Sequence, residues 1–439
     1  MATSNMSVIS PLSKEECHKI VKRYLPIDSF ELKSFTLSPL CTQITGFMGD
    51  HMKLHVTLSL GDKDATAIEL QFFVKSLPLN VYRRSFTMST LSYQKEVLFY
   101  GDFLRKVKKH LRCAAPDAAA TCLATVPRCY YLRPDLLVLG DLSLAGFRML
   151  DPLVPLSLPQ SECVLRALAR LHAASLVFEE REGRRLADAY PLLLEETLFR
   201  KEPAFPPYVA QVSCVRMAHV LLDLVPRFGR GTPLNEQLHR HLEPAMQEIY
   251  EFLRPSDKYR NVLCHRDLWI SNLLFAEDAL GELSVRLVDF QTVHLEPPAH
   301  DVMIFMHWGM LRDLRRAYGR DLLELYHHTL ADVLRHHDLD IDSVLPLQVF
   351  MQSCVETQPL AVILAVYTLQ ATTLPIKKAA DLECFLLNRA ALVRAMYRRD
   401  DRFRRRVTEA MEELVETCLM PRLTYHHQQP PPSKNEREQ

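Results

Sequence analysis

The sequence lacks an excess of charge of either sign. Lysine plus arginine and aspartate plus glutamate each number 53 among 439 residues, so the formal net charge is zero. Without a basic excess we expect no nucleic-acid partner, and without an acidic excess we expect no solvating acidic tail. The apolar share of 48% is large enough for a sizeable core, and the length predicts one large bilobal domain or two domains.

Long hydrophobic segments are missing as well. The N-terminal stretch MATSNMSVISPLSKEEC lacks a charged region followed by an apolar one, so we expect no secretory signal. The longest apolar run, PLAVILAVYTL at 359–369, is too short to span a bilayer and is interpreted as a buried helix. The 11 cysteines are an odd number without C-x-x-C spacing, which favours reduced thiols over a disulfide framework or a zinc site. We therefore expect a cytoplasmic protein without a membrane span.

Hydrophobic alternation typical of strands is concentrated in the first 140 residues. The segments 54–60 and 67–78 each place apolar residues on one face, and the polar turn GDKD separates them. A helical stretch is predicted at roughly 86–108 and a short buried strand at 134–142, and the rest of the chain is mostly helical. This order predicts an α+β protein with two lobes. We expect a small β-rich N-lobe at residues 1–139, a hinge and a larger helical C-lobe at residues 140–423, and a polar, disordered tail at residues 424–439.

The segment HRDLWISNLLF, which begins at His265, has a spacing of polar residues that suits phosphoryl transfer. This reaction requires a carboxylate beside the acceptor hydroxyl, oxygen ligands for magnesium and a cation on the phosphates. Asp267 suits the first role, because it can orient the hydroxyl and take its proton. Asn272 lies five residues later, and a predicted hairpin returns Asp289 beside it, so both can bind the metal. The alternative is that Asp267 and Asn272 cap a turn and that Asp289 caps a helix.

The cation expected upstream is Lys75, which ends a predicted strand in FFVKSLP. Taken alone, a lysine at a strand end is usually a solvated side chain. Glu96 lies 21 residues later in a predicted helix, where it can pair with Lys75 and hold it extended toward phosphate. Glu69 is the alternative partner, because it also lies near Lys75 in the sequence.

Two further segments suit a nucleotide. The turn TGFMGDH at 45–51 contains Gly46 and Gly49, which would let backbone amides approach phosphate, although an ordinary hairpin explains the turn nearly as well. The segment LLVLGDL at 136–142 is interpreted as the hinge between the lobes, where the backbone around Leu139 would bind the adenine edge.

Five segments together resemble the ecdysteroid-kinase-like family, also described as the choline/ethanolamine-kinase-like (CHK kinase-like) group. They are HRDLWISNLLF, LVDFQTVHLEPPAHDV, FFVKSLP, SYQKEVLFY and ALARLHAAS, and the likeness runs from about residue 30 to about residue 420. Gln291 follows Asp-Phe where protein kinases have glycine, and Asp301 follows a Pro-containing loop, as in the family. His172 matches a family position that we expect to brace the catalytic loop.

The resemblance implies a protein-kinase-like fold and an enzyme that uses ATP and Mg²⁺ to phosphorylate hydroxyl groups of small molecules. The best known acceptors of the family are ecdysteroid hormones, and foreign compounds are suspected for other members. The resemblance also implies that Lys75 and Glu96 grip the phosphates, that Asp267 is the catalytic base, and that Asn272 and Asp289 bind magnesium.

Three positions depart from the family pattern. Arg266 stands where the family commonly has glycine, which puts a bulky cation beside the base, and Gly140 replaces an acid in the hinge. The glycine turn is degenerate, although Asp50 after Gly49 resembles the family and is included among the nucleotide-binding residues. The central catalytic positions are all present, so we expect an active enzyme.

No motif identifies the acceptor. An ecdysteroid or another lipophilic alcohol would require a cavity lined by Met, Phe and Leu, whereas a choline- or aminoglycoside-type kinase with a cationic acceptor would require acids and aromatic faces. A pseudokinase that binds a nucleotide or ligand without turnover is the third possibility. An apolar group either lines the acceptor pocket or packs a helix: Met303, Phe305, Met306, Trp308 and Met310. The sequence does not determine the oligomeric state, and a monomer is favoured.

Overall fold

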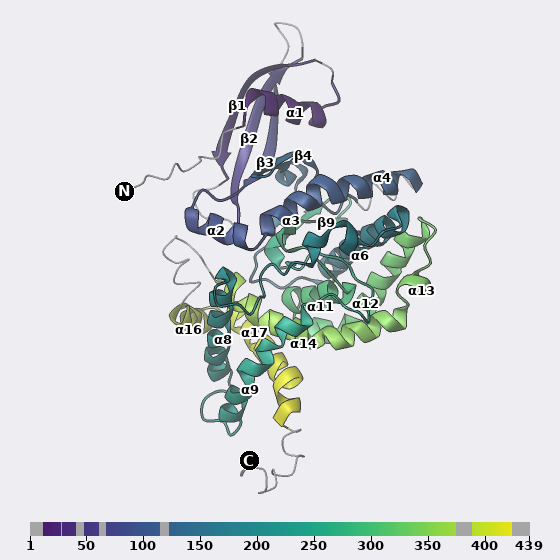
Figure 1. The fold of residues 1–439 in the computed structure, drawn as a ribbon. Helices are drawn as coiled ribbons and strands as arrows, with labels where there is room; N and C mark the ends of the chain where they lie inside the picture. Colours follow the sequence, from purple (N-terminus) through teal and green to yellow (C-terminus); the bar gives the residue numbers. More distant parts are fainter. Residues whose placement is uncertain are drawn as a thin grey trace.

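The computed structural model describes residues 12–27, 29–40, 48–60, 67–114, 123–374 and 389–423. Within these ranges the chain forms a small β-rich lobe and a larger helical lobe (Figure 1). The predicted α+β class with a bilobal arrangement is therefore confirmed. The predicted phosphate-binding Gly46 and the predicted tail 424–439 lie outside the described residues.

Five antiparallel strands form the sheet of the N-lobe in the order β1-β2-β3-β5-β4. Their bounds are β1 Glu31–Pro39, β2 Asp50–Ser59, β3 Ile68–Ser76, β4 Cys129–Arg133 and β5 Leu136–Gly140. Leu70, Phe72 and Val74 of β3 are buried in one core with residues of helix α1, Lys14–Tyr24. Because side chains alternate along a strand, Lys75 projects from the opposite face, where it meets the C-lobe.

The helical stretch predicted at roughly 86–108 is divided in the structure. Its parts are α2 Val81–Ser89, α3 Ser92–Leu98, the π-helix η1 Phe99–Phe103 and α4 Leu104–Ala114. The chain breaks between α2 and α3 at Leu91, whose φ of 57° lies in the left-handed region. Hydrophobic spacing did not predict the break, because it reports which side chains share a face and not the backbone conformation of one residue.

Helices dominate the C-lobe. The long helices α6 (Leu158–Glu182) and α12 (Arg312–Arg335) pack together, and α14 (Leu347–Thr372) packs against α11 (Pro298–Gly309). The other described α-helices of this lobe are α7 Leu186–Ala189, α8 Pro206–Leu224, α9 Asn235–Gln247, α10 Ile249–Phe252, α13 Ile341–Val344, α16 Ala390–Arg399 and α17 Asp401–Leu414, which continues as the π-helix η6 Val415–Leu419.

Two small sheets carry the polar loops of the C-lobe. Strands β7 (Val262–Cys264) and β10 (His294–Glu296) pair with each other. Strand β8 (Leu273–Glu277) lies between β6 (Arg148–Met149) and β9 (Leu283–Leu287). The β8–β9 hairpin confirms the two short strands that the sequence predicted around a polar turn.

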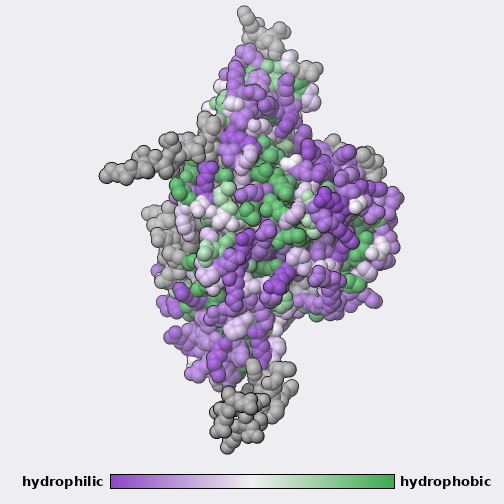
Figure 2. All heavy atoms as spheres, viewed as in Figure 1, coloured by the Kyte–Doolittle hydropathy of each residue, from purple (hydrophilic) through white to green (hydrophobic). Residues whose placement is uncertain are grey.

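One hydrophobic core crosses the boundary between the lobes. It joins Phe99 and Phe103 of η1 and Leu137 and Leu139 of β5 to residues of α6, α11 and α12. Figure 2 shows hydrophobic residues gathered at the middle of the visible face, between the narrow sheet lobe and the broad helical lobe. The shared core fixes α3 and α4 against the C-lobe, so residues of both lobes keep a defined spacing at the site described below.

Helix α14 is long and apolar enough to cross a membrane by length and composition, and it is the one such helix in the part of the chain that the structure describes. Of its most apolar window, 61% is buried inside the protein. The helix packs against α8, α11 and α17. The apolar run 359–369 is therefore a buried helix, as predicted.

Candidate active site

The predicted catalytic loop, residues 265–272, connects strand β7 to strand β8. The β8–β9 hairpin then returns the chain, and the N–H of Val288 donates to the carbonyl oxygen of Asn272 at 3.1 Å. This contact places Asp289 beside the end of the loop, as predicted. Arg266 and Asp289 have φ values of 65° and 69°, a left-handed conformation that is costly for residues with side chains.

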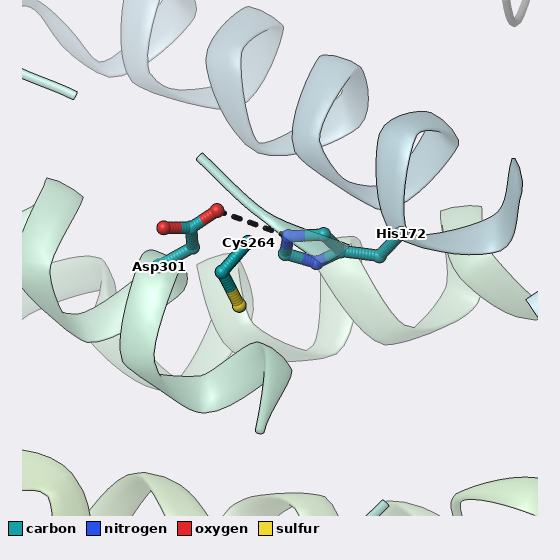
Figure 3. A group of neighbouring side chains, drawn as sticks. All are labelled: His172, Cys264 and Asp301. Atoms are coloured by element: carbon teal, nitrogen blue, oxygen red, sulfur yellow. Dashed lines mark hydrogen bonds and ion pairs between the residues drawn. The ribbon is translucent and has the colours of Figure 1, made fainter. Parts of the chain in front are cut away.

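A buried aspartate holds the catalytic loop from behind. Asp301, in the first turn of α11, accepts hydrogen bonds from the backbone N–H groups of His265 at 2.6 Å and Arg266 at 2.8 Å. Nε2 of His172 on α6 lies 3.1 Å from the same carboxylate (Figure 3). The other ring nitrogen of His172 contacts the Tyr326 hydroxyl at 2.6 Å. The expected bracing role of His172 is therefore confirmed, and it acts through Asp301.

Cys264 lies next to His172 and Asp301, and the three offer ligand atoms within 4.8 Å of one another (Figure 3). The Cys264 thiol donates toward the carbonyl oxygens of Glu296 and Pro297, each at 3.5 Å. Burial, followed by the charge of Asp301, raises the pKa of this thiol well above its usual range. A metal requires a thiolate, and Asp301 is already bound to the loop backbone. The group is therefore a brace for the loop.

Two neighbours fix the orientation of Asp267. Nδ1 of His265 accepts a hydrogen bond from the Asp267 N–H at 3.2 Å, and Nε2 donates to the Val288 carbonyl at 3.0 Å. These partners assign the neutral tautomer with its proton on Nε2, and burial lowers the pKa of His265. Nδ2 of Asn272 donates to the carbonyl oxygen and to Oδ2 of Asp267, both at 2.8 Å. The amide oxygen of Asn272 is then the atom with which it can bind a metal ion.

The acidity of Asp267 is shifted toward neutral pH. Burial raises the pKa of Asp267 to about 7, and the negative charge of Asp289 adds to this effect. The hydrogen bond from Asn272 acts in the opposite direction. A carboxyl group with a pKa near the working pH combines a high basicity with a sufficient ionised fraction, which is the condition for a general base.

Lys75 connects the two lobes through two carboxylates. Its Nζ lies 2.7 Å from Oε2 of Glu96 on α3 and 2.8 Å from Oδ1 of Asp289. The predicted ion pair with Glu96 is therefore confirmed. The alternative partner, Glu69, is exposed on the sheet and accepts a hydrogen bond from the Thr57 hydroxyl at 3.1 Å.

One ammonium group serves both carboxylates. Burial alone would lower the pKa of Lys75, but Asp289 and Glu96 raise it overall. Burial raises the pKa of Glu96. Burial acts in the same direction on Asp289, but the charge and hydrogen bond of Lys75 outweigh it, so the pKa of Asp289 is lowered. Asp289 is thus held ionised beside the Asn272 amide. Carboxylate and amide oxygens are the ligands that Mg²⁺ prefers, so Asp289 and Asn272 fit the predicted metal site.

The glycine turn is held by helix α2. Arg83 of α2 binds Oδ1 of Asp50 at 2.7 Å and the Gly49 carbonyl at 2.8 Å, and the Leu79 N–H donates to Oδ2 of Asp50 at 2.7 Å. Both carboxylate oxygens of Asp50 therefore bind the protein itself, and its contact with a nucleotide stays a prediction. A Cβ atom at Gly49 would lie 3.0 Å from Cε of Lys75, so glycine permits the close approach of the turn to this side chain.

The predicted hinge residue Leu139 lies inside the sheet. In β5 it pairs with Phe73 of β3 and with Cys129 of β4, and its side chain is buried in the core shared by the lobes. The chain leaves the sheet after Gly140, and the next residue, Asp141, binds Lys53 at 3.4 Å. The adenine contact of Leu139 stays a prediction.

A cavity of about 230 Å³ lies beside Asp267. Helices α8 and α14 and the segment 196–199 supply most of its lining, and α2 and α11 contribute Phe86 and Trp308. Of the apolar group predicted from the sequence, Trp308 lines this cavity, whereas the other four pack in the main core: Met303, Phe305, Met306 and Met310.

Sequence reasoning missed the charged residues around Arg266. Its guanidinium lies 2.7 Å from Glu196 and 3.5 Å from Glu296. Glu196 and Glu296 also form a possible ligand group with His294, but Glu196 already binds Arg266 and two backbone N–H groups, and Glu296 binds Arg266 and His300. Arg266 and Glu196 are 70 residues apart in the sequence. A contact over this separation leaves no local pattern, so no signal in the sequence identified Glu196.

Solved structures with some likeness to the chain are kinases of small molecules by their names. An ethanolamine kinase of Plasmodium vivax has 10% identity and a TM-score of 0.35, with 86% of this chain and 81% of that chain covered. A GDP complex of aminoglycoside 2'-phosphotransferase-IIIa has 12% identity and a TM-score of 0.34, with 92% and 98% covered. A microcompartment-associated aminopropanol kinase has 13% identity and a TM-score of 0.32, with 85% and 94% covered. Likenesses this low carry no conclusion about activity.

The sequence itself matches a family model. No curated protein matches the chain. Residues 44–339 match the model of the ecdysteroid kinase-like family, and this range contains the Lys75–Glu96 ion pair, the catalytic loop and Asp289. Since the match covers more than half of the 439 residues, this small-molecule kinase belongs to the ecdysteroid kinase-like family.

Proposed function

We propose that the enzyme transfers the terminal phosphoryl group of ATP, with Mg²⁺, to a hydroxyl group of a lipophilic small molecule such as an ecdysteroid or a foreign compound. The observation that carries the proposal is the mainly apolar cavity beside Asp267. A cavity next to a general base is where an acceptor hydroxyl has to lie if the base is to take its proton.

The catalytic residues have distinct tasks in this proposal. Asp267, oriented by Asn272 and His265, accepts a hydrogen bond and then the proton of the acceptor hydroxyl. Lys75, held by Glu96, binds a non-transferred phosphate. Asn272 and Asp289 hold the metal, and Mg²⁺ supplies neutralisation of the phosphate charge when it is bound.

The lining of the cavity supports a neutral, lipophilic acceptor. Its apolar walls include Phe199, Leu364 and Tyr367. The acids in the described lining are Asp267 and Glu196, and Glu196 is already bound to Arg266 at 2.7 Å. A cationic acceptor would therefore lie beside the positive charge of Arg266. The one carboxylate left to bind its charge would be that of Asp267, which is needed as the base.

A cationic acceptor has one observation in its favour. Four aromatic rings line the cavity, from Phe86, Phe199, Trp308 and Tyr367, and aromatic faces attract quaternary ammonium groups. Choline and an aminoglycoside therefore belong in the test beside the lipophilic alcohols.

The test is a mass-spectrometric assay of the purified enzyme with ATP and Mg²⁺. The acceptors are ecdysteroids, sterols, aliphatic alcohols, plant phenols, choline and an aminoglycoside, and Asp267→Asn is the control enzyme. We expect a phosphoryl mass gain on lipophilic alcohols and a loss of about a thousandfold in the control. A gain on choline alone would replace the lipophilic acceptor, and near-normal turnover by Asp267→Asn would remove the assigned base.

A further inference from the structure

We infer that Arg266 is a positioning residue that ties one wall of the acceptor cavity to the catalytic loop through Glu196. This inference rests on the proposed function, because it takes the cavity beside Asp267 as the acceptor site. In this inference the bond between Arg266 and Glu196 sets the affinity of the cavity for the acceptor.

The connection begins at the catalytic loop. The backbone N–H of Arg266 donates to Asp301, the same carboxylate that receives the N–H of His265. The backbone of Arg266, the residue that precedes Asp267, is thus held by Asp301 independently of the Arg266 side chain. The Arg266 side chain is 6% exposed, and its Nη1 lies 2.7 Å from Oε2 of Glu196.

The connection ends in the cavity wall. Oε1 of Glu196 accepts the backbone N–H groups of Leu198 at 2.8 Å and Phe199 at 3.0 Å. Leu198 and Phe199 both line the cavity, as do Glu196, Arg266 and Asp267. One glutamate therefore holds the turn of the wall with one oxygen and the catalytic loop with the other. A shift of this turn changes the shape of the acceptor cavity and with it the affinity for the acceptor.

A second bond anchors the same wall to the nucleotide side of the enzyme. Nζ of Lys95 on α3 donates to the carbonyl oxygens of Glu195 at 2.6 Å and Val293 at 2.9 Å. The neighbouring residue, Glu96, is the partner of Lys75. Two basic residues therefore hold the segment 195–199: Lys95 binds the Glu195 carbonyl oxygen, and Arg266, next to the base Asp267, binds the Glu196 carboxylate.

The backbone of Arg266 indicates that its side chain has a task beyond stability. Its φ of 65° is a conformation that glycine adopts without cost and that a long side chain resists. A glycine at this position would remove that strain and would leave the hydrogen bond from residue 266 to Asp301 intact, because that bond uses the backbone. What the arginine adds is its contacts with Glu196 and Glu296.

The experiment compares Arg266→Gly, Glu196→Gln and the double variant with the wild type. The acceptor is 1-octanol, which serves as a small neutral probe of the apolar cavity beside Asp267. Glu413→Gln is the matched control, since Glu413 is similarly buried and pairs with Arg315 away from the cavity. Each enzyme is assayed for KM of octanol, KM of ATP and kcat, and its melting temperature is recorded.

We expect the KM for octanol to rise about tenfold in Arg266→Gly and in Glu196→Gln, with kcat and the KM for ATP little changed. The KM for octanol of the double variant should be no higher than that of either single variant, because both substitutions remove the same Arg266–Glu196 bond. Glu413→Gln should keep the wild-type KM at a comparable loss of melting temperature. An unchanged KM in Glu196→Gln, or an equal change in Glu413→Gln, would overturn the inference.

A binding measurement separates this inference from the proposed function. Octanol binding is followed in the absence of ATP by the tryptophan fluorescence, to which Trp308 of the cavity lining and Trp269 of the loop beside it both contribute. If the wild type binds octanol but phosphorylates no alcohol, the proposed function fails, and weaker binding by Glu196→Gln still supports the positioning role. Equal binding by wild type and variant would overturn that role. A wild type that binds and phosphorylates none of the lipophilic alcohols of the panel would overturn both.

Discussion

Asp267 carries a charge that the folded protein disfavours. Burial and the charge of Asp289 raise its pKa to about 7, whereas an aspartate in an unfolded chain has a value near 4. In the proposed function the same feature would serve catalysis, because it makes the carboxylate a stronger base. At the scale of the residue, this basicity has a cost in stability, and the cost depends on pH.

We predict that Asp267→Asn abolishes turnover and stabilises the protein above pH 7. Between pH 4 and pH 7 the folded protein keeps a proton on Asp267 that the unfolded chain has lost, so the free energy of unfolding falls as pH rises through this window. Asparagine has no such proton to lose. We expect the variant to be more stable than the wild type by on the order of 2 kcal/mol at pH 8, after allowance for partial exposure.

Urea unfolding of both proteins at pH 4 and pH 8 measures this effect. The difference should fall to a few tenths of a kcal/mol, on the order of RT ln 2, at pH 4, where Asp267 is protonated in the folded state and about half protonated in the unfolded chain. A variant that is less stable than the wild type at pH 8 would show that the Asp267 carboxylate is not strained in the fold. Asp278→Asn, on the exposed β8–β9 turn, is a control for the loss of one carboxylate.

We predict that Gly49→Ala weakens ATP binding without loss of the acceptor site. The new Cβ would lie 3.0 Å from Cε and 3.2 Å from Cγ of Lys75, so the lysine has to move from its position between Glu96 and Asp289. The KM for ATP should rise about tenfold, with little change in the KM for the alcohol. Gly319→Ala is the control, since its Cβ would have its nearest neighbour at 3.8 Å. Equal values of KM for ATP in both variants would contradict the prediction.

At the scale of secondary structure, the cavity beside Asp267, which is the proposed acceptor site, is a product of helix packing. Helices α8 and α14 pack against each other, and α11 contributes Trp308 to the same space. Two small residues belong to its lining, Ala210 on α8 and Ala371 on α14. A larger side chain at either position would take up part of the cavity.

We predict that Ala210→Leu blocks the acceptor and not the nucleotide. Leucine is a good helix former, so α8 should keep its structure, while the added carbon atoms occupy part of about 230 Å³. The KM for octanol should rise about tenfold and the KM for ATP should not change. Val209→Leu, at an exposed neighbour on α8, is the matched control and should behave as wild type. Octanol kinetics of Ala210→Leu that equal those of the control would place the acceptor elsewhere.

At the scale of the whole molecule, the site is assembled from both lobes. Lys75 comes from the sheet, Glu96 from α3 and Asp289 from the hairpin of the C-lobe, and Phe290 packs face to face on Phe99 with ring centres 3.9 Å apart. The boundaries drawn from the sequence at residues 139 and 423 stay a prediction, as does the cytoplasmic location.

We predict that ATP stabilises the whole protein and that Mg²⁺ increases the effect. A ligand at 100 times its Kd adds about 2.7 kcal/mol to the free energy of unfolding, which should raise the melting temperature by a few degrees. Melting curves with ATP alone, with ATP and Mg²⁺, and with Asp289→Asn measure the metal contribution. The increment due to Mg²⁺ should disappear in Asp289→Asn. An increment that persists in this variant would remove Asp289 from the metal site.

Much of the site is readable from the sequence because it is local. The spacing of Asp267, Asn272 and Asp289 spans one loop and one hairpin, so the geometry of two short strands brings the three together. The partner of Lys75 was readable in part, since Glu96 lies in the helical stretch predicted after the strand, but the structure had to decide between Glu96 and Glu69. The break at Leu91 was not readable, because it depends on one backbone torsion.

The sequence by itself determined the α+β class, the order of the lobes, the family and the position of the candidate catalytic loop. Only the tertiary structure decided which of the apolar residues after Asp301 lines the cavity, that Asp50 is bound to Arg83, and that Arg266 is neutralised by Glu196. The physical reason is the range of the contacts. Alternation, loop spacing and turn chemistry act over a few residues, whereas a cavity and a buried ion pair join segments whose proximity is fixed only when the lobes pack.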